Sequence, residues 1–431
     1  MEILALLLFL SIFVLILYGY PVAFTLGGVS LLYALCFLDP ASFSALPPRI
    51  MGVMSNYVLL AVPLFIYMGI MLEKSGIAER LLEAMAMLFG RKRGGLAISV
   101  VIVGALLAAS TGIVGATVVT MGLISLPTML KRGYRTEVAT GVIAASGTLG
   151  QIIPPSVVLV LLGSVLQVSV GDLFAAALVP GILLVLCYLI YLLLVSRFRP
   201  NWAPAIPWEE IRQFRTKGYG WRVFQAFLLP FLLIVAVLGS IFWGLASPTE
   251  AAAVGALGAT LLTIFQGKFK WDIFQKVMRE TTLLTSMVFM ILLGATTFSF
   301  VFREMGGDLY LVELIQSSNL PHWGFLLLVM VVVFITGFFI DFIEIIFILV
   351  PVVAPIFVEY NMDLVWIGVL LGLNLQTSFL TPPFGFSLFY LKGVAPPEVT
   401  TTQLYRGIIP FVLIQLAFLL LIAFFPDLLR W

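Results

Sequence analysis

The sequence predicts an all-α polytopic membrane protein, built as an inverted repeat with two re-entrant helical hairpins and two discontinuous helices. The first observation is composition: of 431 residues, 62% are hydrophobic and 10% are charged, with a mean hydropathy of +1.16. A soluble domain carries about 25% charged residues, so lipid must be the main solvent of this chain. The second observation is the recurrence of apolar runs of bilayer-spanning length. The third is a set of landmarks repeated at a fixed spacing.

Other features exclude several classes of protein. The net charge is only +2, and no basic patch interleaved with aromatic residues indicates nucleic acid as a partner. Cys36 and Cys187 lie in apolar runs and are interpreted as buried or lipid-facing thiols. His322 is the only histidine, so it forms no metal cluster. No catalytic triad, metal motif or nucleotide-binding loop is present, and we do not expect an enzyme.

Ten apolar runs are predicted to span the membrane as helices. They cover residues 3–19, 22–38, 54–73, 134–165, 172–196, 223–243, 250–267, 282–302, 363–391 and 407–425. The first run follows Glu2 with no Lys or Arg before it and no small-residue cleavage site, so it is predicted to be a membrane helix and not a signal peptide.

Two further apolar stretches, Leu96–Leu130 and Phe325–Val358, are too long for one crossing and contain small or polar residues midway. Each is predicted to enter the membrane and leave on the same side as a hairpin. Non-helical backbone at that depth is tolerated only where protein or a water-filled cavity covers it.

Segments that mix charged and apolar residues connect these elements. Ile77–Phe89, Trp208–Arg222 and Phe269–Glu280 are predicted to be helices in the membrane interface, although a solvated loop is an equal alternative for the second. Ser247–Ala253 is typical of a helix start, with Ser247 or Thr249 as the N-cap.

An internal repeat organises the chain. Five pairs of landmarks keep their order at an offset of 228 (382 − 154) or 230 (306 − 76) residues. They are Pro154-Pro155 with Pro382-Pro383, Pro127 with Pro355, the tips Thr111-Gly112 with Phe339-Ile340, Gly76 with Gly306, and Pro180 with Pro410. The expected divisions are scaffold helices 1–53, a first repeat 54–196 (hairpin 91–133, broken helix 134–165), a link with scaffold helices 197–281, and a second repeat 282–425 (hairpin 321–360, broken helix 363–391).

Charge predicts that the two copies are inverted. Arg91–Arg93 and Lys131–Arg135 flank the first hairpin with basic residues, whereas Asn319–Pro321 and Glu359–Asp363 flank the second without any. Because basic flanks stay in the cytoplasm, the two hairpins should enter from opposite sides. Both termini are then periplasmic. The remaining basic segments are cytoplasmic in the same topology: Arg197–Arg222, Lys268–Arg279, Lys392 and Arg406.

The two Pro-Pro pairs predict breaks within helices. Proline removes a backbone donor and clashes with the preceding turn, so two in succession should unwind the helix after Gly147–Gly150 and after Gln376–Ser378. Unwinding frees carbonyl groups and exposes helix ends. Carbonyls and hydroxyls suit Na⁺, and helix N-termini suit a carboxylate, as in transporters with inverted repeats.

The candidate site lies between the two hairpin tips. The first tip, Ala109–Thr117, is rich in small residues, for which ordinary helix packing is the alternative. The second carries Asp341 and Glu344, acids that are costly within a membrane and therefore candidates for function. Asp341 is predicted near a cation, with a turn cap as the alternative, and Glu344 is either protonated or a helix cap. The predicted substrate-binding residues are Thr117, Gln151, Pro154, Glu344, Asn374 and Pro382.

Four stretches resemble the large membrane subunit of tripartite ATP-independent periplasmic (TRAP) transporters over nearly the whole chain. They are Gly147–Ser156, Ser247–Ala253, Leu130–Tyr134 and Phe379–Gly385. The resemblance implies an elevator-type transporter in the bacterial inner membrane, driven by Na⁺. It also implies a small four-helix membrane subunit as partner and a periplasmic binding protein that delivers an organic acid.

The resemblance further implies sodium sites where the hairpin tips meet the broken helices. One set comprises Ser110, Thr111, Gly112, Gly147 and Thr148, and the other comprises Gly337, Asp341, Thr377, Ser378 and Thr381. Two alternatives remain open: a stand-alone Na⁺/dicarboxylate symporter, and a membrane scaffold that transports nothing. Deleting a neighbouring binding-protein gene tests the first, and Asp341→Ala with Thr148→Ala tests the second.

Overall fold

The structure is a computed structural model that describes residues 2–111, 114–207, 209, 212, 219–317, 320–383 and 385–426. Throughout these ranges the regular structure is helical. Within the described residues, six helical segments are long and apolar enough to cross a membrane alone, or seven if one bent pair counts as a span. Shorter apolar helices include the first two of the chain and several arms of the hairpins and broken helices. The chain is therefore a multi-pass membrane protein, as its composition predicts.

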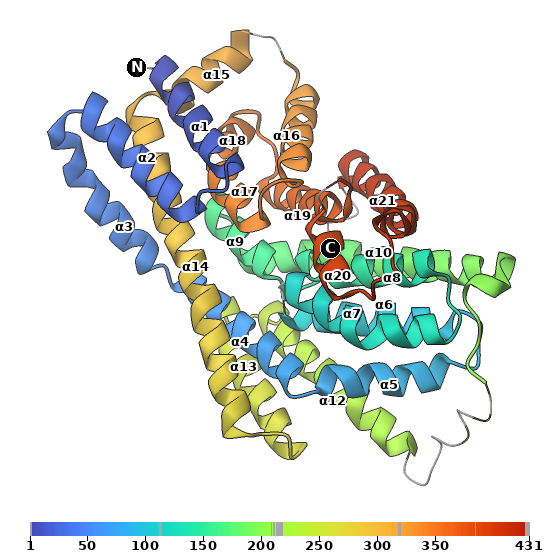
Figure 1. The fold of residues 1–431 in the computed structure, drawn as a ribbon. Helices are drawn as coiled ribbons and strands as arrows, with labels where there is room; N and C mark the ends of the chain where they lie inside the picture. The colour runs from blue at the N-terminus through green and yellow to red at the C-terminus, as the bar shows by residue number, and fades with distance from the viewer. Residues whose placement is uncertain are drawn as a thin grey trace.

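The N-terminal helices pack along one long helix of the second half. α1 (Glu2–Leu17) and α2 (Val22–Phe37) match their predicted ranges, whereas α3 (Leu46–Met54), which follows a short 3₁₀ turn, was not predicted. α2 packs against α14 (Trp271–Glu304), and a methyl group added at Gly294 of α14 would lie 2.5 Å from the Ala23 carbonyl oxygen. Figure 1 shows α2, α3 and α14 forming one flank of the molecule.

The first half of the repeat follows the predicted order. The helices are η2 (Tyr57–Leu60) with α4 (Ala61–Lys74), α5 (Ile77–Phe89), α6 (Gly95–Thr111), α7 (Val114–Lys131), α8 (Thr136–Thr148), η3 (Leu149–Gln151), α9 (Val157–Leu166) and α10 (Val170–Phe198). α6 and α7 form the expected helix–turn–helix, and α8 to α9 form the expected broken helix. The connection then runs through α12 (Tyr219–Phe242) and α13 (Pro248–Phe265), while most of the predicted segment Trp208–Arg222 lies outside the described residues.

The second half repeats this order. After α14 come α15 (Gly307–Ser317), α16 (His322–Thr336), α17 (Phe342–Ile348), α18 (Val350–Glu359), α19 (Leu364–Leu380), α20 (Phe386–Val394) and α21 (Thr401–Phe424). α17 and α18 together form the second arm of the hairpin and are bent by 51°. Figure 1 places this hairpin, α19, α20 and α21 near the helices of the first repeat.

The structure corrects one prediction of separate elements. An interfacial helix at Phe269–Glu280 and a spanning helix at 282–302 were expected, but both belong to the continuous helix α14. No glycine or proline interrupts this helix before Gly294, so its polar first turns pass directly into the apolar part. Ion pairs accommodate the charges of these turns: Lys276 lies 3.9 Å from Asp272, and Glu280 lies 3.2 Å from Lys74.

The repeated landmarks occupy equivalent structural positions. Gly76 and Gly306 each follow a helix that precedes a hairpin, with φ of 73° and 77°, where glycine avoids the cost of a left-handed backbone. The prolines agree as well: Pro127 and Pro355 lie inside the second arm of each hairpin, and Pro180 and Pro410 lie inside α10 and α21. The landmark residues therefore hold matching places in the order of helices, while the inverted repeat itself stays a prediction.

Candidate functional site

Both Pro-Pro pairs lie where a helix is interrupted. Between η3 and α9, the Ser156 hydroxyl donates to the Gln151 carbonyl at 2.8 Å. Between α19 and α20, the Ser387 hydroxyl donates to the Phe379 carbonyl at 3.1 Å. Tyr405 of α21 also donates to the Pro383 carbonyl at 2.6 Å. Some carbonyls released by unwinding are therefore satisfied by the protein itself, which fixes the shape of each break.

Hydroxyl side chains cluster on the helices that lead into the breaks. Each donates to a carbonyl of its own helix: Thr148 to Ala145 at 2.9 Å, Thr377 to Leu373 at 2.7 Å, Ser378 to Leu375 at 2.8 Å and Thr381 to Thr377 at 2.8 Å. Because the hydrogens point back into the helix, the oxygen lone pairs stay available as acceptors. This chemistry fits a hard cation such as Na⁺, which binds neutral oxygen atoms.

The first hairpin packs tightly on the first break. A methyl group added at Gly147 would lie 3.2 Å from Val118 Cα, and one at Gly150 would lie 2.5 Å from the Ala108 carbonyl oxygen. Of the first predicted cation set, the structure places Gly147 against this hairpin, and the adjacent Thr148 is fully buried. Gly112 and the side chains of Ser110 and Thr111 lie outside the described part of the chain.

The second hairpin packs on the second break in the same way. A methyl group added at Gly337 would lie 2.7 Å from Ser378 Cβ. Asn374 of α19 donates to the Met330 carbonyl of α16 at 2.7 Å. Gly337 and Ser378, both predicted cation-site residues, are thus in contact. Asn374 was predicted to bind substrate, and in this conformation its amide tethers the hairpin to the broken helix.

Asp341 and Glu344 form a reciprocal cap at the start of α17. The Asp341 carboxylate accepts from the Phe342 amide at 2.7 Å, and the Asp341 amide donates to Glu344 Oε2 at 3.2 Å. Both side chains are partly buried, and no ion pair joins them to a lysine or arginine of the described ranges. The turn-capping alternative is therefore present in the structure, and a cation or substrate role for these acids stays a prediction.

The remaining predicted substrate residues are mostly buried. Gln151 is fully buried, Thr117 is 2% exposed, Pro154 is buried and Pro382 is partly buried. Neither Gln151 nor Gln376 uses its side-chain amide in a hydrogen bond with the residues described, although both amides are fully buried. A methyl group at Gly372, one turn before Gln376, would lie 4.0 Å from the Gln151 carbonyl oxygen, so the two breaks approach each other here.

The second halves of the broken helices cross between repeats. α20 packs on α7 of the first hairpin, and α9 packs on α17 and α18 of the second. A methyl group added at Gly115, close to the first tip, would lie 3.0 Å from the ring of Tyr390 in α20. Ring contacts through Phe386 and Phe379 link Tyr390 to Phe342, which follows the second tip. Tyr390 therefore lies between the two tips. Its role was not predicted, although an aromatic residue two turns after Pro-Pro was a usable signal.

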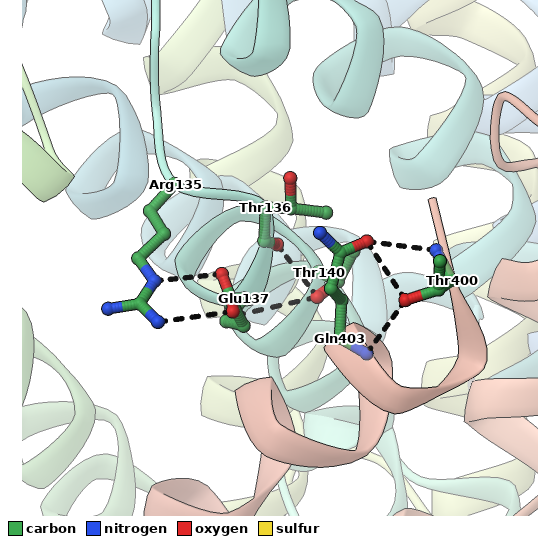
Figure 2. Close-up of polar contacts among 6 residues, drawn as sticks. All are labelled: Arg135, Thr136, Glu137, Thr140, Thr400 and Gln403. Atoms are coloured by element: carbon green, nitrogen blue, oxygen red, sulfur yellow. Dashed lines mark hydrogen bonds and ion pairs between the residues drawn. The ribbon is translucent and has the colours of Figure 1, made fainter. Parts of the chain in front are cut away.

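The starts of α8 and α21 lie beside each other, and Figure 2 shows the polar contacts within each of these helix starts. Arg135 pairs with Glu137 through two hydrogen bonds of 2.9 and 3.2 Å, and its guanidinium lies 4.0 Å from the Trp202 ring centroid. Thr400 and Gln403 form a capping box at the start of α21. The two helices pack closely, because a methyl group added at Gly407 of α21 would lie 2.9 Å from the Thr140 hydroxyl oxygen of α8.

Contacts between the hairpins and the long helices differ in chemistry. Thr120 of α7 donates to Glu73 of α4 at 2.8 Å, a contact that was not predicted. The second hairpin instead faces α1 and α14 across a wholly apolar cavity of about 230 Å³. Residues lining it include Leu6, Phe9, Phe302, Val329 and Val353.

Comparisons with known proteins agree with this architecture. The family model described as "Tripartite ATP-independent periplasmic transporter, DctM component" matches residues 9–428. The C4-dicarboxylate TRAP transporter large permease protein DctM of Pseudomonas aeruginosa is 33% identical, over 93% of this chain and 91% of that protein. The ectoine/5-hydroxyectoine TRAP transporter large permease protein UehC of Ruegeria pomeroyi is 29% identical, over 97% and 96%.

A solved structure shares the fold. The YdaH transporter of Alcanivorax borkumensis superposes with a TM-score of 0.62 at 15% identity, covering 89% of this chain and 88% of that one. At this identity the likeness concerns the fold alone.

Proposed function

Because the chain belongs to the DctM component family of tripartite ATP-independent periplasmic transporters, we propose that it couples the import of an organic acid to Na⁺ entry. The membrane is the bacterial inner membrane. The observation that carries the proposal is the pair of interrupted helices, each with buried hydroxyls beside a hairpin. Thr148 lies at the first break, and Thr377 and Ser378 precede the second. These oxygens would hold Na⁺, which supplies positive charge beside a bound carboxylate.

The substrate is proposed to bind between the two hairpin tips. The two relatives are named for C4-dicarboxylates and for ectoine, both of which carry a carboxylate group. No ion pair links Asp341 or Glu344 to a basic residue within the described ranges, so a carboxylate finds no guanidinium there. Cations and helix ends must then compensate its charge, and this requirement would couple substrate to Na⁺.

Transport is proposed to follow an elevator mechanism. The hairpins and broken helices would move as one body against a scaffold that includes α1, α2, α4 and α14. Two observations support sliding at this boundary: the second hairpin faces α1 and α14 across an apolar cavity, and Thr120 of α7 forms a hydrogen bond with Glu73 of α4. An exchangeable hydrogen bond of this kind contributes only about 0.5–1.5 kcal/mol when another donor can replace the lost one.

Inverted repeats and two partners complete the proposal. The basic flank at Arg91–Arg93 and the acidic flank at Glu359–Asp363 support opposite orientations of the two hairpins. Inversion would let each repeat close the site toward one side of the membrane. A small four-helix membrane subunit would complete the scaffold, and a periplasmic binding protein would deliver the acid.

The test is uptake in proteoliposomes that contain this chain and the small subunit encoded with it. A panel of radiolabelled organic acids is supplied with the neighbouring binding protein, with and without an inward Na⁺ gradient. Uptake should require both the gradient and the binding protein. Uptake without the binding protein would favour a stand-alone symporter, and absence of Na⁺-dependent uptake of every acid would refute the proposal.

A further inference from the structure

A row of aromatic rings crosses the second break. The ring centroids of Phe342 and Phe379 are 5.9 Å apart, those of Phe379 and Phe386 are 5.1 Å apart, and those of Phe386 and Tyr390 are 6.5 Å apart. Phe342 follows the second hairpin turn, whereas Tyr390 contacts the first hairpin at Gly115. The row therefore extends from one hairpin to the other along the region where a substrate would bind.

The two ends of this row differ in exposure. Phe342 and Phe379 are buried, Phe386 is partly exposed and Tyr390 is 37% exposed. The inner rings thus support the outer two, which still have free surface. Aromatic surface of this kind favours contact with another ring or with an apolar body.

Among the described residues, the hydroxyl of Tyr390 has no hydrogen-bond partner. A phenol is a good donor to a carboxylate. The other groups near the tips, Asp341 and Glu344, are acids without basic partners in the described ranges. If one carboxylate lies at Tyr390, a second one at the far end of the substrate would approach these acids beside Phe342 and be repelled.

We propose that Tyr390 determines substrate specificity, and that the substrate is a monocarboxylate with an aromatic body. The Tyr390 hydroxyl donates to the carboxylate, while its ring and that of Phe386 cover the body. The inference rests on the proposed function, because it assumes that an organic acid binds between the tips. It departs from the C4-dicarboxylates for which the relative from Pseudomonas aeruginosa is named.

Two probes separate the possibilities because they differ in one group. Succinate and 3-phenylpropionate share a three-carbon acid chain, and the second carboxylate of succinate is replaced by a phenyl ring. Binding of each labelled acid is measured on the full chain with its small subunit in lipid nanodiscs, at saturating Na⁺. We expect 3-phenylpropionate to bind at least about tenfold more tightly than succinate.

Variants of Tyr390 then test its role in specificity. Tyr390→Phe should weaken binding of 3-phenylpropionate about tenfold and keep the preference over succinate, because only the hydrogen bond is lost. Tyr390→Leu should also remove the preference, because the ring is lost. Phe265→Ala is the control, because Phe265 is an aromatic residue at the end of α13 that is 80% exposed. This variant should bind both probes with wild-type affinity.

Several outcomes overturn the inference. They are equal or tighter binding of succinate by the wild type, failure of both probes to bind, or unchanged affinities in Tyr390→Leu. The proposed function is judged separately by Na⁺-dependent uptake across the acid panel. If uptake of a dicarboxylate succeeds while the aromatic probe fails, the specificity inference falls and the transporter assignment stands.

Discussion

Thr120 of the first hairpin donates a hydrogen bond to Glu73 of α4 over 2.8 Å. The Glu73 side chain is only 14% exposed, and the Lys74 ammonium lies 4.0 Å from its carboxylate. This contact joins the proposed moving body to the proposed scaffold, so its strength bears on both stability and motion.

Thr120→Val should lower the free energy of unfolding by about 1–3 kcal/mol, because it leaves a largely buried carboxylate without its donor. The measurement is thermal unfolding of the purified chain. The control is Thr128→Val in the same helix, since the Thr128 hydroxyl bonds only to the Ile124 carbonyl of α7. Equal effects of the two substitutions would mean that the contact with Glu73 adds nothing.

Gly147→Ala and Gly337→Ala should each destabilise the protein and reduce uptake. The added methyl groups would meet Val118 and Ser378, and overpacking of this kind costs about 1–3 kcal/mol. Gly393→Ala in α20 is the matched control, because nothing lies within 4 Å of a methyl group there. Normal thermal unfolding and uptake of both test variants would contradict the close packing of hairpins on breaks.

Thr148→Val and Thr377→Val should raise the Na⁺ concentration for half-maximal uptake about tenfold, the equivalent of about 1.4 kcal/mol for one lost oxygen ligand. Valine preserves the shape of threonine, so the fold should survive. Thr282→Val is the control, because Thr282 is exposed on α14 and its hydroxyl bonds only to the Met278 carbonyl. An unaltered Na⁺ dependence in both test variants would remove these residues from the ion site.

Substitutions at Asp341 distinguish a helix-capping role of this side chain from a role of its negative charge in transport. Asparagine is as good an N-cap as aspartate, so Asp341→Asn should keep the helix start, whereas Asp341→Ala should cost about 1 kcal/mol of stability. If the charge serves only the cap, Asp341→Asn will transport normally. We expect instead that Asp341→Asn unfolds at the wild-type temperature but loses Na⁺-dependent uptake.

The inverted arrangement predicts from which side of the membrane a reagent can label each hairpin flank. In a variant lacking Cys36 and Cys187, a cysteine at Lys92 should react only with a reagent admitted to the cytoplasm. A cysteine at Glu359 should react with an impermeant maleimide added to intact spheroplasts. Labelling of both positions from the same side would disprove the inversion.

The sequence predicted most elements because the signals were local. Apolar runs, glycines and the Pro-Pro pairs placed the hairpins and breaks within a few residues, and Ser247 is the N-cap with Glu250 completing its box. The junction inside α14 was misjudged because charge density was taken as a boundary, although no residue there stops a helix. α3 was missed because it is short and contains two prolines in its first turn.

The candidate site was less predictable because it depends on contacts between distant segments. Tyr390 lies against Gly115 of the first hairpin and against the ring of Phe386 in its own helix. Similarly, Ser156 and Ser387 were not identified as the side chains that close the breaks. Such pairings arise from how helices cross, which residue spacing alone does not encode.

Gly141 of α8 and Gly407 of α21 meet backbone to backbone, and a methyl group at Gly141 would lie 2.7 Å from the Gly407 carbonyl carbon. One glycine comes from each half of the chain, so the two helices form a close seam that cannot open without losing this backbone contact. A moving body that included only one of these helices would have to break the seam. A larger residue at either glycine would separate α8 from α21 at this seam. A compensating change on the opposite helix would then be needed to restore the contact.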